Sequence, residues 1–539
     1  MQNKVLRAAI VCLSLVFITS CTKKGQDVVV QLADGTSVKA ANNETLRVNL
    51  TTEPPTLDWD KSSDTTSSHV SMNLMEGLVE YDFNDKELGL KPSLALKWES
   101  SNSARTWKFT LRQGVKWTDG VEFTAQHVID GWKRLLDPAT ASQYAYSMFG
   151  IKNAEEFSQG KIKDFSQVGV SAPTPYELVV ELKQSMAYFP YLLTHHAAFP
   201  IRADVVKKHG DKWTEPGNIV TLGPFKLAAW QHDNQILLER NDSYYGEKPS
   251  IKYVLMYMIL EQATAINLFD SGKLDAVVNL PATELRSLKK RPEYKELGIL
   301  QLYYYGMNTK VPPMNNVKVR KALAHAIDKK RVVQMLDGGE IPMSSWIPPG
   351  MFGYEAERGL TFDPVKAKEL LKQAGYPDPS KLPTLTIGFN TNENHQRIAE
   401  NIQAQLKENL GINVELKNEE WKVYLNSLTT GTYPLFRFGW LADFPDPHNF
   451  FSLITGNSDN NKTFWKNAEF DTLISQGASE SDKSKRRDIY SRAQKILVED
   501  DVPVIPILAS VQHALVSTRT ENFPLNAMDQ RIYKGVKLK

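Results

Sequence analysis

Cysteine is almost absent from this 539-residue chain, which has only Cys12 and Cys21. Cys12 lies in an apolar N-terminal segment that is typical of a signal peptide, so the mature chain would keep Cys21 alone. One cysteine at the start of the mature chain excludes a disulfide within it. It also excludes a cysteine-based metal site and a cysteine nucleophile in the folded body.

An excess of charge of either sign is also absent. The chain has 64 basic and 62 acidic residues, and removing the N-terminal segment with Lys4 and Arg7 leaves 62 of each. A balanced chain has no general attraction to nucleic acid. The short basic runs at 289–291 and 485–487 lie in helical polar patterns typical of solvated faces. We therefore expect no nucleic-acid partner.

Catalytic signatures are missing as well. The sequence has no glycine-rich phosphate loop followed by Lys, no His-Glu-x-x-His and no Gly-x-Ser-x-Gly. His195 and His196 are adjacent, and adjacent residues seldom share a metal ion in regular structure. The group Asp443, Asp446 and His448 is interrupted by two prolines that stiffen the backbone. We expect no enzyme, no metal and no cofactor, although paired carboxylates leave the enzyme alternative open.

The N-terminus carries an export signal. Lys4 and Arg7 precede an apolar run at 8–18, which is too short to cross a bilayer as a helix but typical of a secretory signal. The following Ile-Thr-Ser-Cys21 resembles a bacterial lipobox. That resemblance implies cleavage after residue 20 and lipidation of Cys21. The alternative is an ordinary signal peptide followed by a stray cysteine.

The chain after the signal divides into a tether and a large body. Residues 21–44 are polar and have few large apolar residues, as expected of a tether between a membrane and a folded body. No later run is long and apolar enough to be a second membrane segment. The body has about 495 residues, too many for one hydrophobic core, so we expect two or three domains.

Hydrophobic periodicity predicts strands and helices mixed throughout the body. Between 363 and 440 they alternate regularly, which indicates a parallel sheet covered by helices. The predicted strands are 46–50, 107–111, 176–182, 235–239, 385–389, 412–416 and 436–440. The predicted helices are 125–136, 263–268, 317–327, 363–374, 395–409 and 420–428.

Asp443 is the most informative single residue. Phe438, Trp440, Leu441 and Phe444 surround it in the sequence, and no Lys or Arg lies within four residues. An ionised carboxylate in apolar surroundings is costly unless a cation or hydrogen-bond donors meet it. Its place just past a predicted strand is where α/β sheets bind ligands, which suggests a socket for an amine. The alternative is a helix N-cap or turn residue.

From residue 46 to the C-terminus the chain resembles the extracytoplasmic solute-binding proteins of peptide import systems. It is most similar to the oligopeptide-binding and murein-peptide-binding type. The resemblance rests on EPPTLD (53–58), MEGL (75–78), PSLALKWE (92–99), WKFTLR (107–112), VKWTDG (115–120), WKRLLDP (132–138), ASQY (141–144), GDKWT (210–214), LERN (238–241) and EWK (420–422).

This resemblance implies an α/β fold of the periplasmic-binding-protein type, class II, with three lobes. Lobes I and III would close on the ligand around a hinge made by two crossovers. It also implies an oligopeptide ligand, a permease with ATPase subunits as partner, a monomer, and an extracytoplasmic position on the membrane. The implied lobes are lobe I at 45–75, 204–300 and 511–539, lobe II at 76–203, and lobe III at 301–510.

The resemblance also implies roles for single residues. Asp443 would pair with the peptide α-amino group, and Arg437 and His395 would receive its carboxylate. Gly439, Leu441 and, from the opposite lobe, Thr65 would bond its main chain. The implied aromatic contacts are Trp421, Trp440, Tyr144 and Tyr304.

Departures from the family leave the ligand open. Leu428 and the pair Leu336-Asp337 stand where enterobacterial oligopeptide binders carry further basic residues for the carboxylate. Gln301 and Leu441 replace a cysteine pair of some relatives. The same fold could take a murein peptide, a pheromone peptide, haem or a metal chelate. A surface peptidase and an adhesin are the remaining alternatives.

Overall fold

The computed structural model describes residues 27–32, 34–85, 88–186, 188–480 and 482–539. The predicted signal peptide at 1–20 and the predicted lipidation site Cys21 lie outside these residues. Within them, no helix combines the length and the apolar character needed to cross a bilayer.

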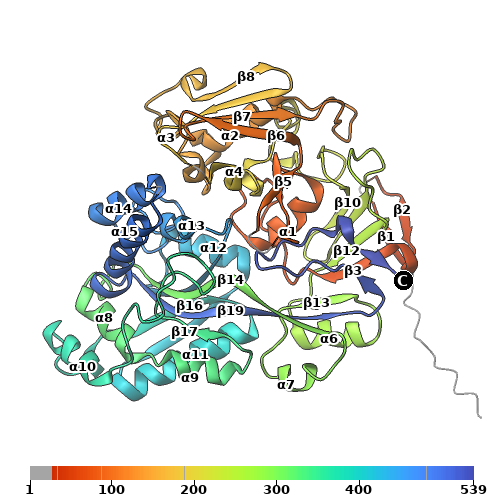
Figure 1. Cartoon of the computed structure of the whole chain (residues 1–539). Helices are drawn as coiled ribbons and strands as arrows, with labels where there is room; N and C mark the ends of the chain where they lie inside the picture. The colour runs from red at the N-terminus through yellow and green to blue at the C-terminus, as the bar shows by residue number, and fades with distance from the viewer. Residues whose placement is uncertain (1–26, 33, 86–87, 187, 481) are drawn as a thin grey trace, which may run out of the picture.

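One mixed sheet of eleven strands runs through the molecule in the order β10-β11-β12-β3-β13-β19-β14-β18-β16-β17, with β15 paired to β19 (Figure 1). Its strands are β3 (Thr45–Asn49), β10 (Phe225–Gln231), β11 (Gln235–Arg240), β12 (Tyr253–Tyr257), β13 (Ala276–Val278), β14 (Tyr294–Met307), β15 (Ile341–Pro342), β16 (Leu385–Asn390), β17 (Val414–Glu419), β18 (Leu435–Leu441) and β19 (Val504–Val516).

Two long antiparallel strands, β14 and β19, connect the two halves of this sheet. β19 pairs with β13 through Ala514–Val516 in lobe I, and β14 pairs with β18 through Gln301–Met307 in lobe III. The register between β14 and β19 shifts between Gly298 and Leu302, where both strands cross the predicted lobe boundaries. A register irregularity marks a local bend in the pairing. β14 and β19 each run without a break past the boundaries predicted for lobes I and III, and the lobe names used below denote those predicted ranges.

Lobe I is built around β3, whose five residues are all buried because it pairs in parallel with β12 on one side and β13 on the other. Only Leu46 and Val48, on one face of β3, are apolar, and the alternating face carries the buried polar residues Thr45, Arg47 and Asn49. The helices of this lobe are α1 (Thr65–Leu74), α6 (Gln262–Asp270) and α7 (Leu285–Leu288). A short pair, β20 (Thr520–Glu521) and β21 (Lys537–Leu538), ends the chain.

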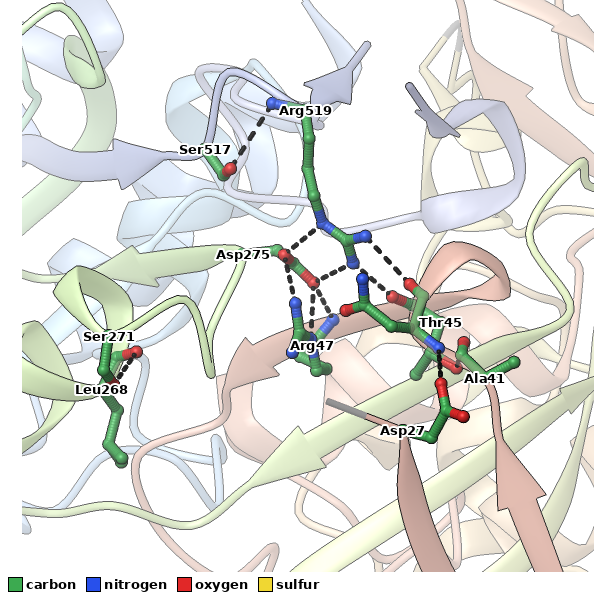
Figure 2. Close-up of polar contacts among 10 residues, drawn as sticks. Asp27, Ala41, Thr45, Arg47, Leu268, Ser271, Asp275, Ser517 and Arg519 are labelled. Carbon is green, nitrogen blue, oxygen red and sulfur yellow. Dashed lines mark hydrogen bonds and ion pairs between the residues drawn. The ribbon is translucent and has the colours of Figure 1, made fainter. Parts of the chain in front are cut away.

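A buried charge cluster joins three distant segments of lobe I (Figure 2). The carboxylate of Asp275, before β13, accepts hydrogen bonds from the guanidinium and backbone N–H of Arg47 in β3. Arg519, after β19, donates to the same carboxylate at 2.7 and 2.9 Å and to the carbonyl oxygen of Thr45. A buried carboxylate needs such partners, so the cluster fixes where the discontinuous pieces meet.

Lobe II has its own four-stranded antiparallel sheet, β6-β7-β9-β8, at the top of Figure 1. Alternate residues of β7 are buried, which confirms the predicted half-buried strand. The predicted helix 125–136 matches α2, which begins with a capping box formed by Thr124 and His127. The elements are β4 (Val79–Tyr81), β5 (Leu90–Pro92), β6 (Ala95–Ser101), β7 (Thr106–Leu111), β8 (Val170–Thr174), β9 (Glu177–Glu181), α2 (Ala125–Leu136), α3 (Ala154–Ser158) and α4 (Phe189–Leu192). α5 (Ala203–His209) begins at the predicted boundary between lobes II and I.

Lobe III contains the predicted parallel strands, but its sheet is mixed. β16 is parallel to β17 and β18, whereas β18 is antiparallel to β14, a long-range pairing that local alternation could not reveal. One helix group packs on each side of the sheet (Figure 1). The first group is α8 (Val317–Ala326), α9 (Lys329–Leu336), α10 (Pro364–Gln373) and α11 (Glu393–Leu410), and the second is α12 (Trp421–Thr430), α13 (Pro447–Ser452), α14 (Ala468–Ser479) and α15 (Lys483–Lys495).

The predicted tether at 21–44 is wrong for its second half. Residues of this segment form an antiparallel pair, β1 (Val28–Gln31) with β2 (Ser37–Ala40). Val30 and Ala40 are buried against lobe I strands, in a cluster with Leu237. The run of valines at 28–30 alternates in burial, and this short apolar signal was outweighed by the polar composition around it.

Candidate ligand-binding cleft

A cavity of about 350 Å³ lies where the three lobes meet. Its floor is formed by β14, β18 and β19, and its walls come from all three lobes. It is lined by nine of the ten predicted binding residues, namely Thr65, Tyr144, His395, Trp421, Arg437, Gly439, Trp440, Leu441 and Asp443.

Asp443 lies two residues past the end of β18, as predicted, and its side chain is 14% exposed. Its Oδ2 accepts a hydrogen bond from Asn449 Nδ2 at 2.8 Å, and its Oδ1 lies 3.3 Å from the hydroxyl of Tyr144. Asn449 Oδ1 accepts the backbone N–H of Asp443, and the hydroxyl of Tyr81 donates to its carbonyl oxygen. The carboxylate is therefore held in one orientation.

The remaining neighbour of this carboxylate is His195, whose Nε2 lies 3.3 Å from Oδ1. The other ring nitrogen, Nδ1, accepts the backbone N–H of Ala197 at 3.2 Å. An accepting Nδ1 carries no proton, so His195 is the neutral tautomer with hydrogen on Nε2. In the described chain no Lys or Arg pairs with Asp443. Hydrogen-bond donors orient this carboxylate, but no protein cation neutralises it.

Tyr144 strengthens this arrangement from lobe II. Its ring stacks on His195 with 4.4 Å between the centroids, and it lies 6.2 Å from the ring of Trp440. Burial, and then the charge of Asp443, raise the pKa of Tyr144 well above its usual value. The hydroxyl therefore stays protonated and acts as a donor to the carboxylate.

The main chain of β18 offers a free edge beside Asp443. β16 pairs with β18 only at Leu435 and Phe436, so the remaining strand has no neighbour on that side among the described strands. The N–H of Ala442 donates to a carbonyl of β14, which orients the even-numbered residues of β18 toward β14. Gly439 and Leu441 therefore direct their N–H and C=O groups into the cleft. An extended chain could pair there as an added strand.

Arg437, also in β18, is a buried cation that lines the cleft. Its guanidinium donates to Asn390 Oδ1 at 3.0 Å and lies 4.6 Å from the ring centroid of Tyr303. Its Nε finds no hydrogen-bond acceptor among the described residues, and no carboxylate of these residues pairs with it. A buried guanidinium without an anion is costly, which suits a site that a ligand carboxylate completes.

His395 stands in the first turn of α11 beside the same tyrosine. Its backbone N–H is capped by Asn392, and its ring lies 5.5 Å from that of Tyr303. Burial, and then the charge of Arg437, hold the pKa of His395 well below its usual range. The ring is therefore neutral and can offer a ligand one N–H donor.

Tyr304 is the predicted site residue that the structure places elsewhere. Successive side chains of a strand point to opposite faces, so Tyr303 lines the cleft while Tyr304 points away from it. Tyr304 is buried against Trp346, with 5.0 Å between the ring centroids, and against Phe438. We therefore replace Tyr304 by Tyr303 as the candidate ligand contact.

Lobe I contributes the N-terminus of α1 to the opposite wall. Thr65 is the exposed first residue of this helix, and Asp64 caps it by accepting the backbone N–H of Ser67. Trp421 Nε1 lies 3.4 Å from Asp64 Oδ1, and Thr52 Oγ1 lies 3.3 Å from Glu420 Oε1. Lobes I and III therefore touch across the cleft.

Sequence reasoning missed two groups that hold Asp443. Asn449 lies six residues further on, in α13, and its side chain also accepts from Trp440 Nε1. His195 comes from lobe II, 248 positions away, and no local pattern connects it with Asp443. Asp446 is the N-cap of α13, where its side chain accepts the backbone N–H of His448.

The positions that depart from the family pattern fall into two groups. Leu336 lines the cleft, whereas Leu428 is buried in α12 and does not. Gln301 and Leu441 face each other in the register of β14 and β18.

Among the described residues, no group of three or more His, Cys, Asp or Glu side chains is placed to hold a metal ion.

Comparison with known proteins gives matches over most of the chain. A sequence model described as bacterial extracellular solute-binding proteins, family 5 middle, matches residues 89–462. The oligopeptide-binding protein OppA of Bacillus subtilis is 37% identical over 86% of this chain and 87% of its own. The crystal structure of a periplasmic oligopeptide-binding protein, OppAIV, from Borrelia burgdorferi has a TM-score of 0.88 at 33% identity, covering 92% of this chain and all of that one.

Two structures of the murein tripeptide-binding protein MppA of Escherichia coli separate two lobe arrangements. One has a TM-score of 0.87 with this chain at 29% identity, covering 94% of this chain and 99% of that one. The structure described as the unliganded open form reaches only 0.63 at 30% identity, covering 93% and 98%. The lobes of this protein are therefore not arranged as in that open form.

Proposed function

The chain belongs to the bacterial extracellular solute-binding proteins of family 5, and on this premise we propose that it is a receptor for oligopeptides. The observation that carries the proposal is Asp443, a carboxylate that hydrogen-bond donors orient but that no Lys or Arg of the described residues neutralises. A peptide α-ammonium group supplies the missing charge and three hydrogen-bond donors. The buried guanidinium of Arg437 supports a matching role for the peptide carboxylate.

The spacing of these two groups suits short peptides. Residues 437 and 441 of β18 are about 13 Å apart along the strand, and Asp443 lies two residues beyond its end. The side chain of Arg437 shortens that gap, because its Nη2 comes within 3.4 Å of where a Cβ on Gly439 would lie. Between the two charges an extended peptide of about three to five residues fits. His395 would serve the longer peptides of this range.

Recognition through the backbone and the termini gives affinity without sequence selectivity. Gly439 and Leu441 would pair with the peptide main chain as an added strand, and Thr65 would bond it from lobe I. Trp421, Trp440, Tyr144 and Tyr303 would line the spaces for side chains, and water would fill what a small side chain leaves open. The protein would bind and release its ligand without changing it.

The cellular role follows from the same proposal. Lipidation at Cys21 would hold the receptor on the outer side of the membrane. A closed, loaded monomer would then dock on an ABC-type permease with ATPase subunits, which would take up the peptide. The lobe boundaries proposed from the sequence would then separate the halves that open and close around β14 and β19.

Native mass spectrometry of the purified mature protein tests the ligand class. We expect a ladder of adducts whose masses match peptides of about three to five residues, released on denaturation. An adduct with the mass of haem, of a metal chelate or of a non-peptide organic acid would refute the proposal. Hydrolysed products after incubation with a defined peptide would instead indicate a peptidase.

The main alternative ligand within the same fold is a murein peptide or a pheromone peptide. The similarity to the murein tripeptide-binding protein favours it. Such ligands also have a free amine for Asp443, so competition between an alanine tripeptide and a murein tripeptide distinguishes them. Equal affinity or a preference for the alanine peptide supports a general oligopeptide receptor.

A further inference from the structure

A second carboxylate, Glu340, lines the cleft at a distance from Asp443. It stands in the loop between α9 and β15, and β15 pairs with β19 at Ile341 opposite Ala509. Gly339, in the same loop, lies against Val511 of β19: a Cβ on Gly339 would be 4.0 Å from a methyl group of Val511. The loop is thus fixed on β19, across the cleft floor from β18.

Glu340 has no cationic partner. Its Oε2 accepts the backbone N–H of Gly338 at 3.1 Å, and its own backbone N–H also donates to the carboxylate, so both donors are neutral main-chain groups. No Lys or Arg of the described chain pairs with it, because the nearby Lys289 pairs with Glu296 at 3.5 Å. Burial raises the pKa of Glu340, as expected of a carboxylate left without a counter-charge.

His513 presents a second acceptor on the same strand, β19. Side chains two positions apart share one face of a strand, so His513 lies on the face of Val511. The ring is 96% buried and lines the cavity, and its Nε2 has no hydrogen-bond partner among the described residues. Leaving a buried ring nitrogen without a hydrogen bond is costly, and a ligand group that bonds to Nε2 would remove this cost.

The hydrogen-bond network decides which kind of group His513 needs. The hydroxyl of Tyr294 has one proton, which it donates to Glu296 Oε2 at 2.8 Å. Nδ1 of His513, 2.7 Å from the same hydroxyl oxygen, must therefore carry a hydrogen and donate. Burial lowers the pKa of His513 to about 4, so the ring is neutral and Nε2 is a bare acceptor.

The groups proposed to bind the peptide carboxylate are connected to the part of the cleft that contains Glu340 and His513. Arg437 and His395 flank the ring of Tyr303, at 4.6 and 5.5 Å from its centroid. Arg397, two residues after His395, donates to the carbonyl oxygen of Met335 at the end of α9 at 3.3 Å. The chain then continues from α9 through Leu336, which lines the cavity, to Glu340.

From this arrangement we propose that Glu340 and His513 form a subsite for the ammonium or guanidinium group of a lysine or arginine side chain near the carboxyl end of the bound peptide. The inference rests on the proposed function. Both protein groups are acceptors, one of them a full negative charge, and a basic side chain brings donors and a positive charge. An acidic side chain or an unpaired carboxylate is repelled at the same place.

Calorimetry with the ligand-free protein tests the subsite. The probes are alanine pentapeptides that carry lysine at position three, four or five, each compared with norleucine, which keeps the length and removes the charge. We expect the lysine peptide to bind about tenfold more tightly at one or more positions, because a hydrogen bond to a charged group stabilises at this level. Glu340→Gln abolishes that preference and leaves the norleucine affinity unchanged, since Gln keeps an acceptor for Gly338.

Asp337→Asn is the matched control. Asp337 is exposed, lies three residues before Glu340 and does not line the cavity, so its substitution removes the same charge without touching the subsite. We expect this variant to keep the preference for lysine. Equal affinity of lysine and norleucine peptides for the wild type, or a preference that survives Glu340→Gln, overturns the subsite. Failure of every pentapeptide to bind refutes the receptor function itself.

Discussion

His195 Nε2 lies 3.3 Å from Asp443 Oδ1, while the Nδ1 of the same ring accepts the backbone N–H of Ala197. This second bond makes His195 a neutral donor. Lobe II therefore orients the carboxylate of lobe III without cancelling its charge. A ligand ammonium group can relieve the cost of that unbalanced charge.

Asp443→Asn removes the charge and keeps the shape of the side chain. We expect affinity for a free tetrapeptide to fall by about 30-fold or more, since losing one partner of a buried charged pair costs about 2–5 kcal/mol. Calorimetry measures the change, and circular dichroism checks that the fold is kept. An affinity within threefold of the wild type would remove Asp443 from the site.

Arg437→Met separates recognition of the peptide carboxylate from the rest of the site. We expect tripeptides with a free carboxylate to bind about 10- to 100-fold more weakly, as for the loss of a charge-assisted bidentate contact. Carboxyl-amidated tripeptides should bind the variant and the wild type alike. If amidated and free tripeptides lose affinity equally, the variant has only disturbed the fold around Tyr303.

Gly439→Val tests the path of the peptide along β18. A Cβ on Gly439 would lie 3.4 Å from Arg437 Nη2 and from the carbonyl oxygen of Leu302. The further methyl groups of valine would occupy the space of the ligand main chain. We expect peptide binding to be lost while the unfolding temperature changes little. Gly535→Val, where nothing lies within 4 Å of the added Cβ, should bind normally.

His448 makes the protein sensitive to acid. Burial lowers its pKa to about 4, the nearby Asp446 opposes this shift, and the charge of Arg486 adds to it. Below about pH 6.5 His448 binds a proton in the unfolded chain but stays neutral in the folded protein. Stability therefore falls as the pH drops from about 6.5 to 4. A shift of this size corresponds to about 3 kcal/mol.

His448→Leu should remove this part of the pH dependence. We expect urea unfolding to show a smaller loss of stability between pH 6.5 and 4.5 for the variant than for the wild type. An identical loss for both would show that His448 titrates normally in the folded protein. Burial also lowers the pKa of His513, so His513 would make the same contribution to the pH dependence of stability in the wild type and in the variant.

Local patterns predicted the elements better than they predicted the site. Helix 125–136 and the strand around Trp107 follow from periodicity, because each buries one face and leaves the other partly exposed. The antiparallel pairing of β18 with β14 joins positions more than 100 residues apart, so the parallel pattern after residue 363 could not reveal it.

The same limit applies to the site residues. Asp443 stood out because its sequence neighbours could not neutralise it, and its place past a strand end followed from the pattern. His195 has no such signal, because its role comes from lobe II docking on lobe III. The predicted contact Tyr304 was wrong by one position, because three successive tyrosines give no indication of which of them faces the cleft.

The most direct test of the central claim is calorimetry of the ligand-free wild-type protein with tetra-alanine and with its N-acetylated form. The two ligands differ only in the ammonium group that Asp443 is proposed to receive. The account predicts measurable binding of the free peptide and a loss of about 100-fold or more on acetylation. Equal affinity for the two peptides would contradict it.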